Sequence, residues 1–150
     1  MSHKYLNAIG VKSNEPCVFN TLDTNNGKER QKRFDKERET YGFDSRETWS
    51  MDYTLATWLY EHLAWYRDNA PIDMTFYKFE VPAWNNKKSR PCKKKTKTLT
   101  QAECVDTMLK NLQFYIQHSD SADNDKVIEA QNRMKYALQI LSESIYVMWW

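Results

Sequence analysis

A run of basic residues near the middle of the sequence is its densest chemical feature. Seven basic residues and no acidic one lie in this run. They are Lys87, Lys88, Arg90, Lys93, Lys94, Lys95 and Lys97. The formal net charge of the chain is only +2, so the remaining residues carry a net negative charge and the two signs are segregated. Side chains of this kind neutralise phosphates, and binding through them depends strongly on salt.

Two interpretations of the basic run stay open from the sequence. The run is either a flexible electrostatic arm that attracts an anionic partner or a solvated loop that contributes only to solubility. Trp84 lies just before the run and offers a surface for stacking. The partner of such an arm would be a nucleic acid, an anionic nucleotide ligand of the signalling type, or an acidic patch on a host protein. Lysines without interleaved aromatic residues do not distinguish these partners.

A second candidate site combines aromatic residues with one carboxylate. Asp52 lies one helical turn after Trp49, between two apolar stripes of an expected helix that also carries Tyr53 and Trp58. An unpaired carboxylate there would be costly, so we expect it to have a partner. The favoured interpretation is packing, with Asp52 bonded to a neighbouring helix. The alternative is a pocket walled by Trp49 and Tyr53, in which Asp52 binds a ligand hydroxyl or amine.

Residue types suited to catalysis or metal binding are scattered along the chain. The three histidines fall in no zinc-ligand spacing, and the chain has no phosphate-binding glycine loop and no G-x-S-x-G sequence. The three cysteines are far apart and without C-x-x-C spacing, which indicates reduced thiols. The sequence therefore predicts no enzyme, no cofactor and no metal site.

Helical patterns dominate the elements that would position these residues. Residues 28–40 form a charged helix with opposite charges at helical spacing. The helix expected over 45–68 begins with a capping box from Asp44 to Glu47 and is apolar over most of its circumference. A second capping box, from Thr100 to Glu103, begins a helix that ends near His118. The last helix is expected to run to the chain end, with an apolar stripe of Val127, Met134, Leu138, Leu141, Ile145 and Met148.

These elements predict a mainly α protein with one domain over its 150 residues. The expected architecture is a compact helical bundle with an irregular N-terminal arm at 1–26 and a central basic loop at 82–99. A short extended segment is expected at 74–81, limited by Pro82.

The stretch YGFDSRETWSMDYTLA, from Tyr41 to Ala56, resembles a pattern in small proteins encoded by tailed bacteriophages and prophages. In those proteins a glycine-aromatic-acidic turn leads into a Trp-Ser-x-Asp helix, and a later helix ends the chain near a Trp. The resemblance covers residues 41–69, with weaker parts at 100–112 and 137–150. It implies a viral origin and no particular activity, although small phage proteins outside the virion often act on host machinery, including immune systems.

Together these observations predict a non-enzymatic phage accessory protein that binds and blocks a host component, in an anti-defence role. The expected target is a host protein or a nucleotide-type signalling molecule. The alternatives are a nucleic-acid-binding module used in phage DNA transactions and a structural oligomer. The apolar circumference of the 45–68 helix predicts a homo-oligomer. No run approaches the roughly 18 apolar residues of a membrane span, so no membrane partner is expected and the predicted location is the cytoplasm of the host bacterial cell.

Overall fold

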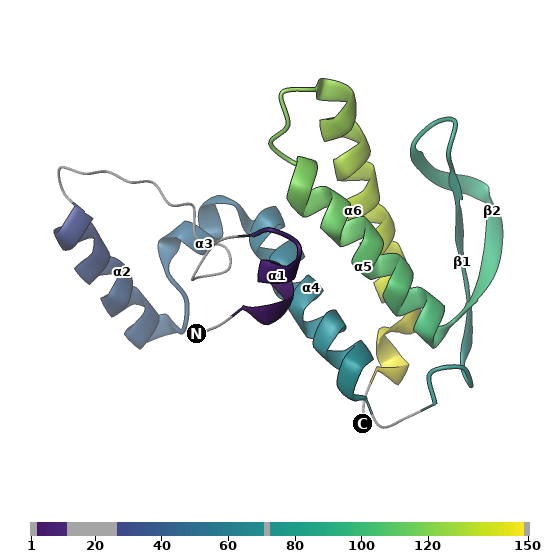
Figure 1. The fold of residues 1–150 in the computed structure, drawn as a ribbon, viewed down its shortest axis with the longest axis horizontal. Coiled ribbons are helices and arrows are strands. Elements are labelled where there is room, and N and C mark those ends of the chain that lie inside the picture. The colour runs from purple at the N-terminus through teal and green to yellow at the C-terminus, as the bar shows by residue number, and fades with distance from the viewer. Residues whose placement is uncertain (1–2, 12–26, 71–72, 149–150) are drawn as a thin grey trace. The chain divides into compact units, whose positions relative to one another are not determined.

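The computed structural model describes residues 3–11, 27–70 and 73–148, which form helices and one two-stranded antiparallel sheet (Figure 1). The elements in chain order are α1 (Lys4–Ala8), α2 (Gly27–Tyr41), α3 (Ser45–Trp49), α4 (Met51–Asn69), β1 (Lys78–Asn85), β2 (Arg90–Thr100), α5 (Gln101–His118), α6 (Asn124–Ser144) and the 3-10 turn η1 (Ile145–Val147). The prediction of a mainly α protein is confirmed, whereas the finer assignment to a helical bundle stays a prediction.

The chain divides into two compact units, Met1–Trp58 and Leu59–Trp150. Helix α4 passes from one unit into the other, and each unit is described by itself below. The single-domain interpretation stays a prediction. Within the predicted irregular arm, Lys4–Ala8 is a short helix, which corrects that part of the prediction, and residues 12–26 lie outside the described residues.

A buried cluster of charges holds α2 and α3 of the first unit together. The Asp44 side chain is fully buried and begins α3 with the predicted capping box. Its carboxylate accepts from Arg46 Nε at 3.0 Å and lies 2.9 Å from Arg38 Nη2 of α2. The Arg46 guanidinium also lies 4.1 Å from the centre of the Phe34 ring. The charged helix α2 thus docks through ion pairs and one buried aromatic side chain.

The single helix predicted over 45–68 is interrupted at Ser50, which corrects that prediction. Ser50 has a non-helical backbone, with φ −137° and ψ 63°, and separates α3 from α4. The Thr54 hydroxyl donates to the Glu47 carbonyl at 2.9 Å, and the Thr54 N–H donates to the Ser50 carbonyl at 2.9 Å. Hydrogen bonds from a threonine hydroxyl offer the backbone an alternative to a continuous helix, and here one of them satisfies a carbonyl at the end of α3.

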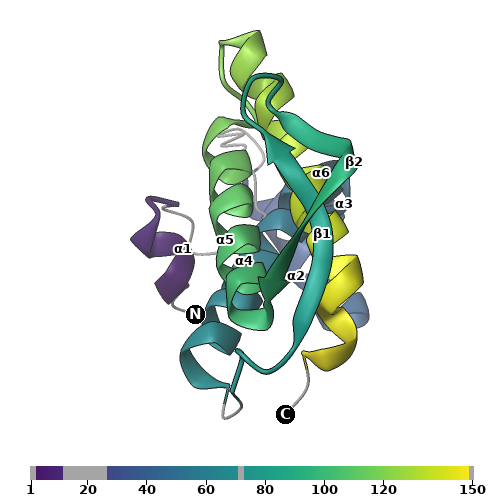
Figure 2. The ribbon, with the colours of Figure 1, turned by 90° about the vertical axis from the view of Figure 1, so that its right-hand side faces the viewer.

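The second unit is built around α5 and α6, which are joined by a short turn and lie side by side (Figures 1 and 2). The predicted capping box from Thr100 to Glu103 begins α5. Helix α6 ends at Ser144 and is followed by η1, so the helix predicted to reach the chain end is shorter. Its buried side chains are Ala130, Met134, Tyr136, Ala137, Ile140 and Ser144. Only Met134 of the predicted stripe belongs to this set, because α6 packs against both α5 and the strands and so buries a different face.

The basic segment belongs to a β-hairpin, which corrects the predicted loop at 82–99. Strands β1 and β2 pair antiparallel, and Figure 2 shows them twisting about each other beside the two helices. β1 continues through Pro82, although the sequence predicted that the extended segment would end before this residue. The Pro82 carbonyl accepts from the Tyr136 hydroxyl at 2.8 Å and therefore points away from β2. Since N and C=O of one residue in an antiparallel strand point to the same side, the missing N–H of Pro82 removes no ladder bond.

Candidate functional site

The hairpin is fastened to α6 by apolar packing and two long-range hydrogen bonds. Val81, Ala83 and Leu99 are buried. The Tyr136 hydroxyl bonds to β1 as described, and the Asn132 amide donates to the carbonyl of Ser89 at 3.1 Å. One bond holds the middle of β1 and the other holds the turn between the strands, so α6 fixes the hairpin at both places.

An arginine between two aromatic rings extends this attachment. The Arg133 guanidinium lies 4.9 Å from the Trp84 ring centre and 4.4 Å from the Phe114 ring centre. The same group donates to Glu129 at 2.8 Å and to Asn111 at 3.2 Å. Arg133 of α6 therefore contacts β1 and α5 at once. Trp84 is half-buried in this contact, and its predicted role as a stacking surface stays a prediction.

A large bulge interrupts the ladder at the centre of the basic run. Pro82 pairs with Thr96, and Trp84 pairs with Pro91. Four residues of β2, Cys92 to Lys95, therefore lie opposite one residue of β1. Extra residues in a bulge bend the strand and redirect its side chains. Three of these four residues are lysines.

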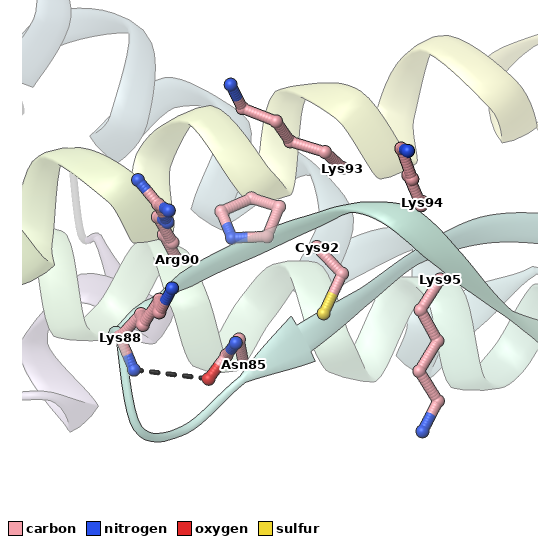
Figure 3. Close-up of a pocket in the computed structure, with 8 residues that line it drawn as sticks. Asn85, Lys88, Arg90, Cys92, Lys93, Lys94 and Lys95 are labelled. Carbon is pink, nitrogen blue, oxygen red and sulfur yellow. Dashed lines mark hydrogen bonds between the residues drawn. The ribbon is translucent and has the colours of Figure 1, made fainter.

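An open hollow of about 320 Å³ lies at this bulge (Figure 3). It is lined by Asn85, Lys88, Arg90, Pro91, Cys92, Lys93, Lys94 and Lys95. Figure 3 shows Lys93 and Lys95 leaving opposite sides of the strand, so the cations surround the bulge. The lining contains five basic side chains, no carboxylate and no aromatic ring.

All seven basic residues of the run are exposed on the hairpin. None of them forms an ion pair with another residue in the described part of the chain. Glu80 is the one acidic residue in the sequence of the hairpin, and it lies on β1, away from the turn. The hairpin therefore presents positive charge to solvent.

Two titratable groups behind the hairpin are held neutral. Burial raises the pKa of the Cys104 thiol to about 11, with a smaller contribution from the negative charge of Glu103. Burial also raises the pKa of Tyr136 to about 12, which keeps its hydroxyl protonated as a donor to Pro82. A thiol with so high a pKa is a poor nucleophile at neutral pH. These groups serve packing.

The second predicted site, which combines aromatic residues with Asp52, is more exposed than expected. Asp52 is exposed, so the expected burial between two stripes is wrong, because one of those stripes, with Met51 and Leu55, is itself exposed. Tyr53 is half-buried and Trp58 is 53% exposed. The side chain of Trp49 lies outside the described residues. The ligand and packing interpretations of this site both stay predictions.

Sequence reasoning missed the residues that hold the hairpin. Tyr136, Asn132 and Arg133 come from α6, more than 40 residues after the segments they bind. Their only sequence signal is that Tyr136 and Arg133 lie near the apolar stripe of α6.

Within the described residues, no group of three or more histidine, cysteine or acidic side chains is placed to hold a metal ion. No described helix is long and apolar enough to cross a membrane. Comparisons with known protein families, with curated proteins and with solved structures find no match for the chain.

Proposed function

We propose that this protein binds nucleic acid through the basic β-hairpin. The observation that carries the proposal is the display of seven exposed cations, without ion-pair partners among the described residues, on a two-stranded ribbon that α6 holds in place. Exposed charges of one sign add little to the stability of a fold. Their concentration on one hairpin is explained better by attraction of a polyanion than by packing.

The shape of the hairpin favours this partner. The major groove of duplex DNA admits a two-stranded β-ribbon. Basic side chains on such a ribbon reach phosphates and release condensed counterions, which gives affinity without dependence on base sequence. The net negative charge of the remaining chain disfavours contact between other surfaces and the polyanion, so it directs the hairpin toward the nucleic acid.

The experiment is a titration of a short labelled DNA duplex with protein at several salt concentrations. The parent protein should bind with an affinity that falls steeply with salt. The variant Lys87→Gln/Lys93→Gln/Lys97→Gln should lower both the affinity and the salt slope, the slope by about 0.9 for each phosphate that the variant no longer neutralises.

The matched control removes the same charge from α2, in the variant Lys28→Gln/Lys32→Gln/Lys36→Gln. These lysines are also exposed, but they lie on a helix that carries acidic residues as well. We expect the control to bind like the parent. An equal loss in both variants would show that net charge alone drives binding, and the proposal would then be wrong.

The role of a phage accessory protein that blocks a host component, in anti-defence, remains a proposal that rests on the resemblance at residues 41–56. A host protein with an acidic patch is the alternative partner of the same hairpin, and absence of nucleic-acid binding in the titration would favour it. The homo-oligomer remains a prediction, to be tested by sedimentation.

A further inference from the structure

The bulge of β2 gathers charge in a way that a regular strand would not. In a regular strand successive side chains point to opposite faces. Here Cys92, Lys93, Lys94 and Lys95 lie opposite Ala83 alone, and the chain bends around the hollow that they line. Lys88 and Arg90 reach the same hollow from the turn and the start of β2 (Figure 3).

The polar groups of the hollow are suited to an anion. The oxygen of the Asn85 side chain already accepts from the backbone N–H groups of Lys87 and Lys88, at 3.0 and 3.2 Å. The other polar group of that side chain is an NH₂ donor. Together with the five cations, the hollow therefore offers donors and positive charge.

Five like charges around one hollow repel one another. Screening at physiological salt acts over about 8 Å, so the repulsion acts between those cations that come within this distance of one another. A bound anion would relieve it and gain charge-assisted hydrogen bonds. The volume, about 320 Å³, lies at the lower end of the range of ligand pockets, roughly 300 to 1,000 Å³. It therefore has room for a phosphate or a diphosphate group.

We propose that the hollow at the bulge is a phosphate-binding subsite, which takes one phosphate group of a nucleic-acid backbone or one diphosphate unit of free inorganic polyphosphate. The inference rests on the proposed function of the same hairpin and divides its cations into two sets. Lys88, Arg90, Lys93, Lys94 and Lys95 line the hollow and supply the positive charge that attracts a phosphate there. Lys87 and Lys97 do not line it and provide only diffuse attraction. With no aromatic ring in the lining, recognition is independent of the base.

The test compares two variants that each remove two positive charges. The inner variant is Lys93→Gln/Lys94→Gln, and the outer variant is Lys87→Gln/Lys97→Gln. Duplex DNA binding is measured by titration at a single salt concentration, and binding of inorganic pyrophosphate is measured by calorimetry. The inner variant should lose about tenfold in duplex affinity and its binding of pyrophosphate, because it removes hydrogen bonds to a charged group. The outer variant should lose about threefold for the duplex and keep pyrophosphate binding.

A deletion of Cys92, Lys93 and Lys94 provides a second variant that tests the shape of the site. It leaves one residue of β2 opposite Ala83, which restores a regular ladder, and it removes the same charge as the outer variant. Circular dichroism verifies that the variant folds. The deletion should abolish pyrophosphate binding, whereas retention of pyrophosphate binding would overturn the subsite.

The outcomes separate the two proposals. If the parent binds duplex DNA and the inner and outer variants lose equal affinity, the subsite is wrong and nucleic-acid binding stands. If the parent binds pyrophosphate through the inner lysines but binds no nucleic acid, the subsite stands with free polyphosphate as its ligand and the proposed function is wrong. Binding of neither ligand overturns both.

Discussion

The two charged regions of this protein differ in whether their charges are paired within the protein. Around Asp44 in the first unit, a buried carboxylate is bonded to two arginines, and the Arg46 guanidinium covers an aromatic ring. On the hairpin of the second unit, seven cations are exposed and form no ion pair within the described residues. The first arrangement builds a fold, because each charge satisfies another. The second leaves its attraction available to a partner molecule.

Removing the buried carboxylate tests the first half of this comparison and should have the largest effect. Asp44→Asn leaves the buried Arg46 without its counter-charge, and breaking a buried pair in this way costs about 3–5 kcal/mol. The free energy of unfolding of the part that contains α2 and α3 should fall accordingly in a urea titration followed by circular dichroism. Asp35→Asn, on the exposed side of α2, is the control and should change it by less than about 0.5 kcal/mol. A stable Asp44→Asn variant would show that the cluster does not hold the helices.

Acid should weaken the same cluster. Burial alone would raise the pKa of Asp44, but the hydrogen bonds from Arg46 and the charges of Arg46 and Arg38 outweigh it, so the pKa lies below its usual value. A carboxyl group with a depressed pKa in the folded state contributes stability that is present above the unfolded pKa and is lost as pH falls through the folded pKa. Stability measured between pH 7 and pH 2 should therefore fall at the acid end. Asp44→Asn should lose the part of that dependence that comes from Asp44, while Glu37 and Asp73, whose pKa values are also lowered by hydrogen bonds, keep theirs.

The substitution Arg133→Gln should weaken the attachment of the hairpin and cause an intermediate loss of unfolding free energy. The substitution removes the cation from two aromatic contacts and from Glu129, and each cation–π contact contributes about 0.5–1 kcal/mol at exposed sites. We expect a loss of about 1–2 kcal/mol in unfolding free energy and faster hydrogen exchange of the β1 amides. Lys135→Gln, at an exposed position of α6, should leave both measurements unchanged. Unaltered exchange in Arg133→Gln would mean that the hairpin is held by its apolar contacts alone.

Tyr136→Phe removes one hydrogen bond and keeps the ring. Without the bond to the Pro82 carbonyl, the unfolding free energy should fall by about 0.5–1.5 kcal/mol. Nuclear magnetic resonance of the β1 amides near Pro82 should show the change, while α5 remains as in the parent. A shift spread equally over all helices would argue against a local anchor.

The sequence predicted the elements that local rules determine. The capping boxes at Asp44 and Thr100 are confirmed, because a cap depends on residues three positions apart. The hairpin was missed because Pro82 and a run of lysines argue against a strand, while its stability comes from Tyr136 and Arg133, far away in the chain. The cations of the candidate site were visible from composition. Their gathering around a hollow depends on a bulge in the strand register, which no local pattern encodes.

Charge reversal at Lys93, Lys94 and Lys95 to glutamate tests most directly the claim that the hairpin charges serve binding and not folding. The free energy of unfolding and the affinity for duplex DNA are measured on the same preparation. We expect a change in stability of less than about 0.5 kcal/mol, since exposed charges contribute little to it, together with a loss of duplex binding at low salt. Unchanged binding at low salt, or a loss of stability comparable to that of Asp44→Asn, would show that the hairpin charges do not serve binding alone.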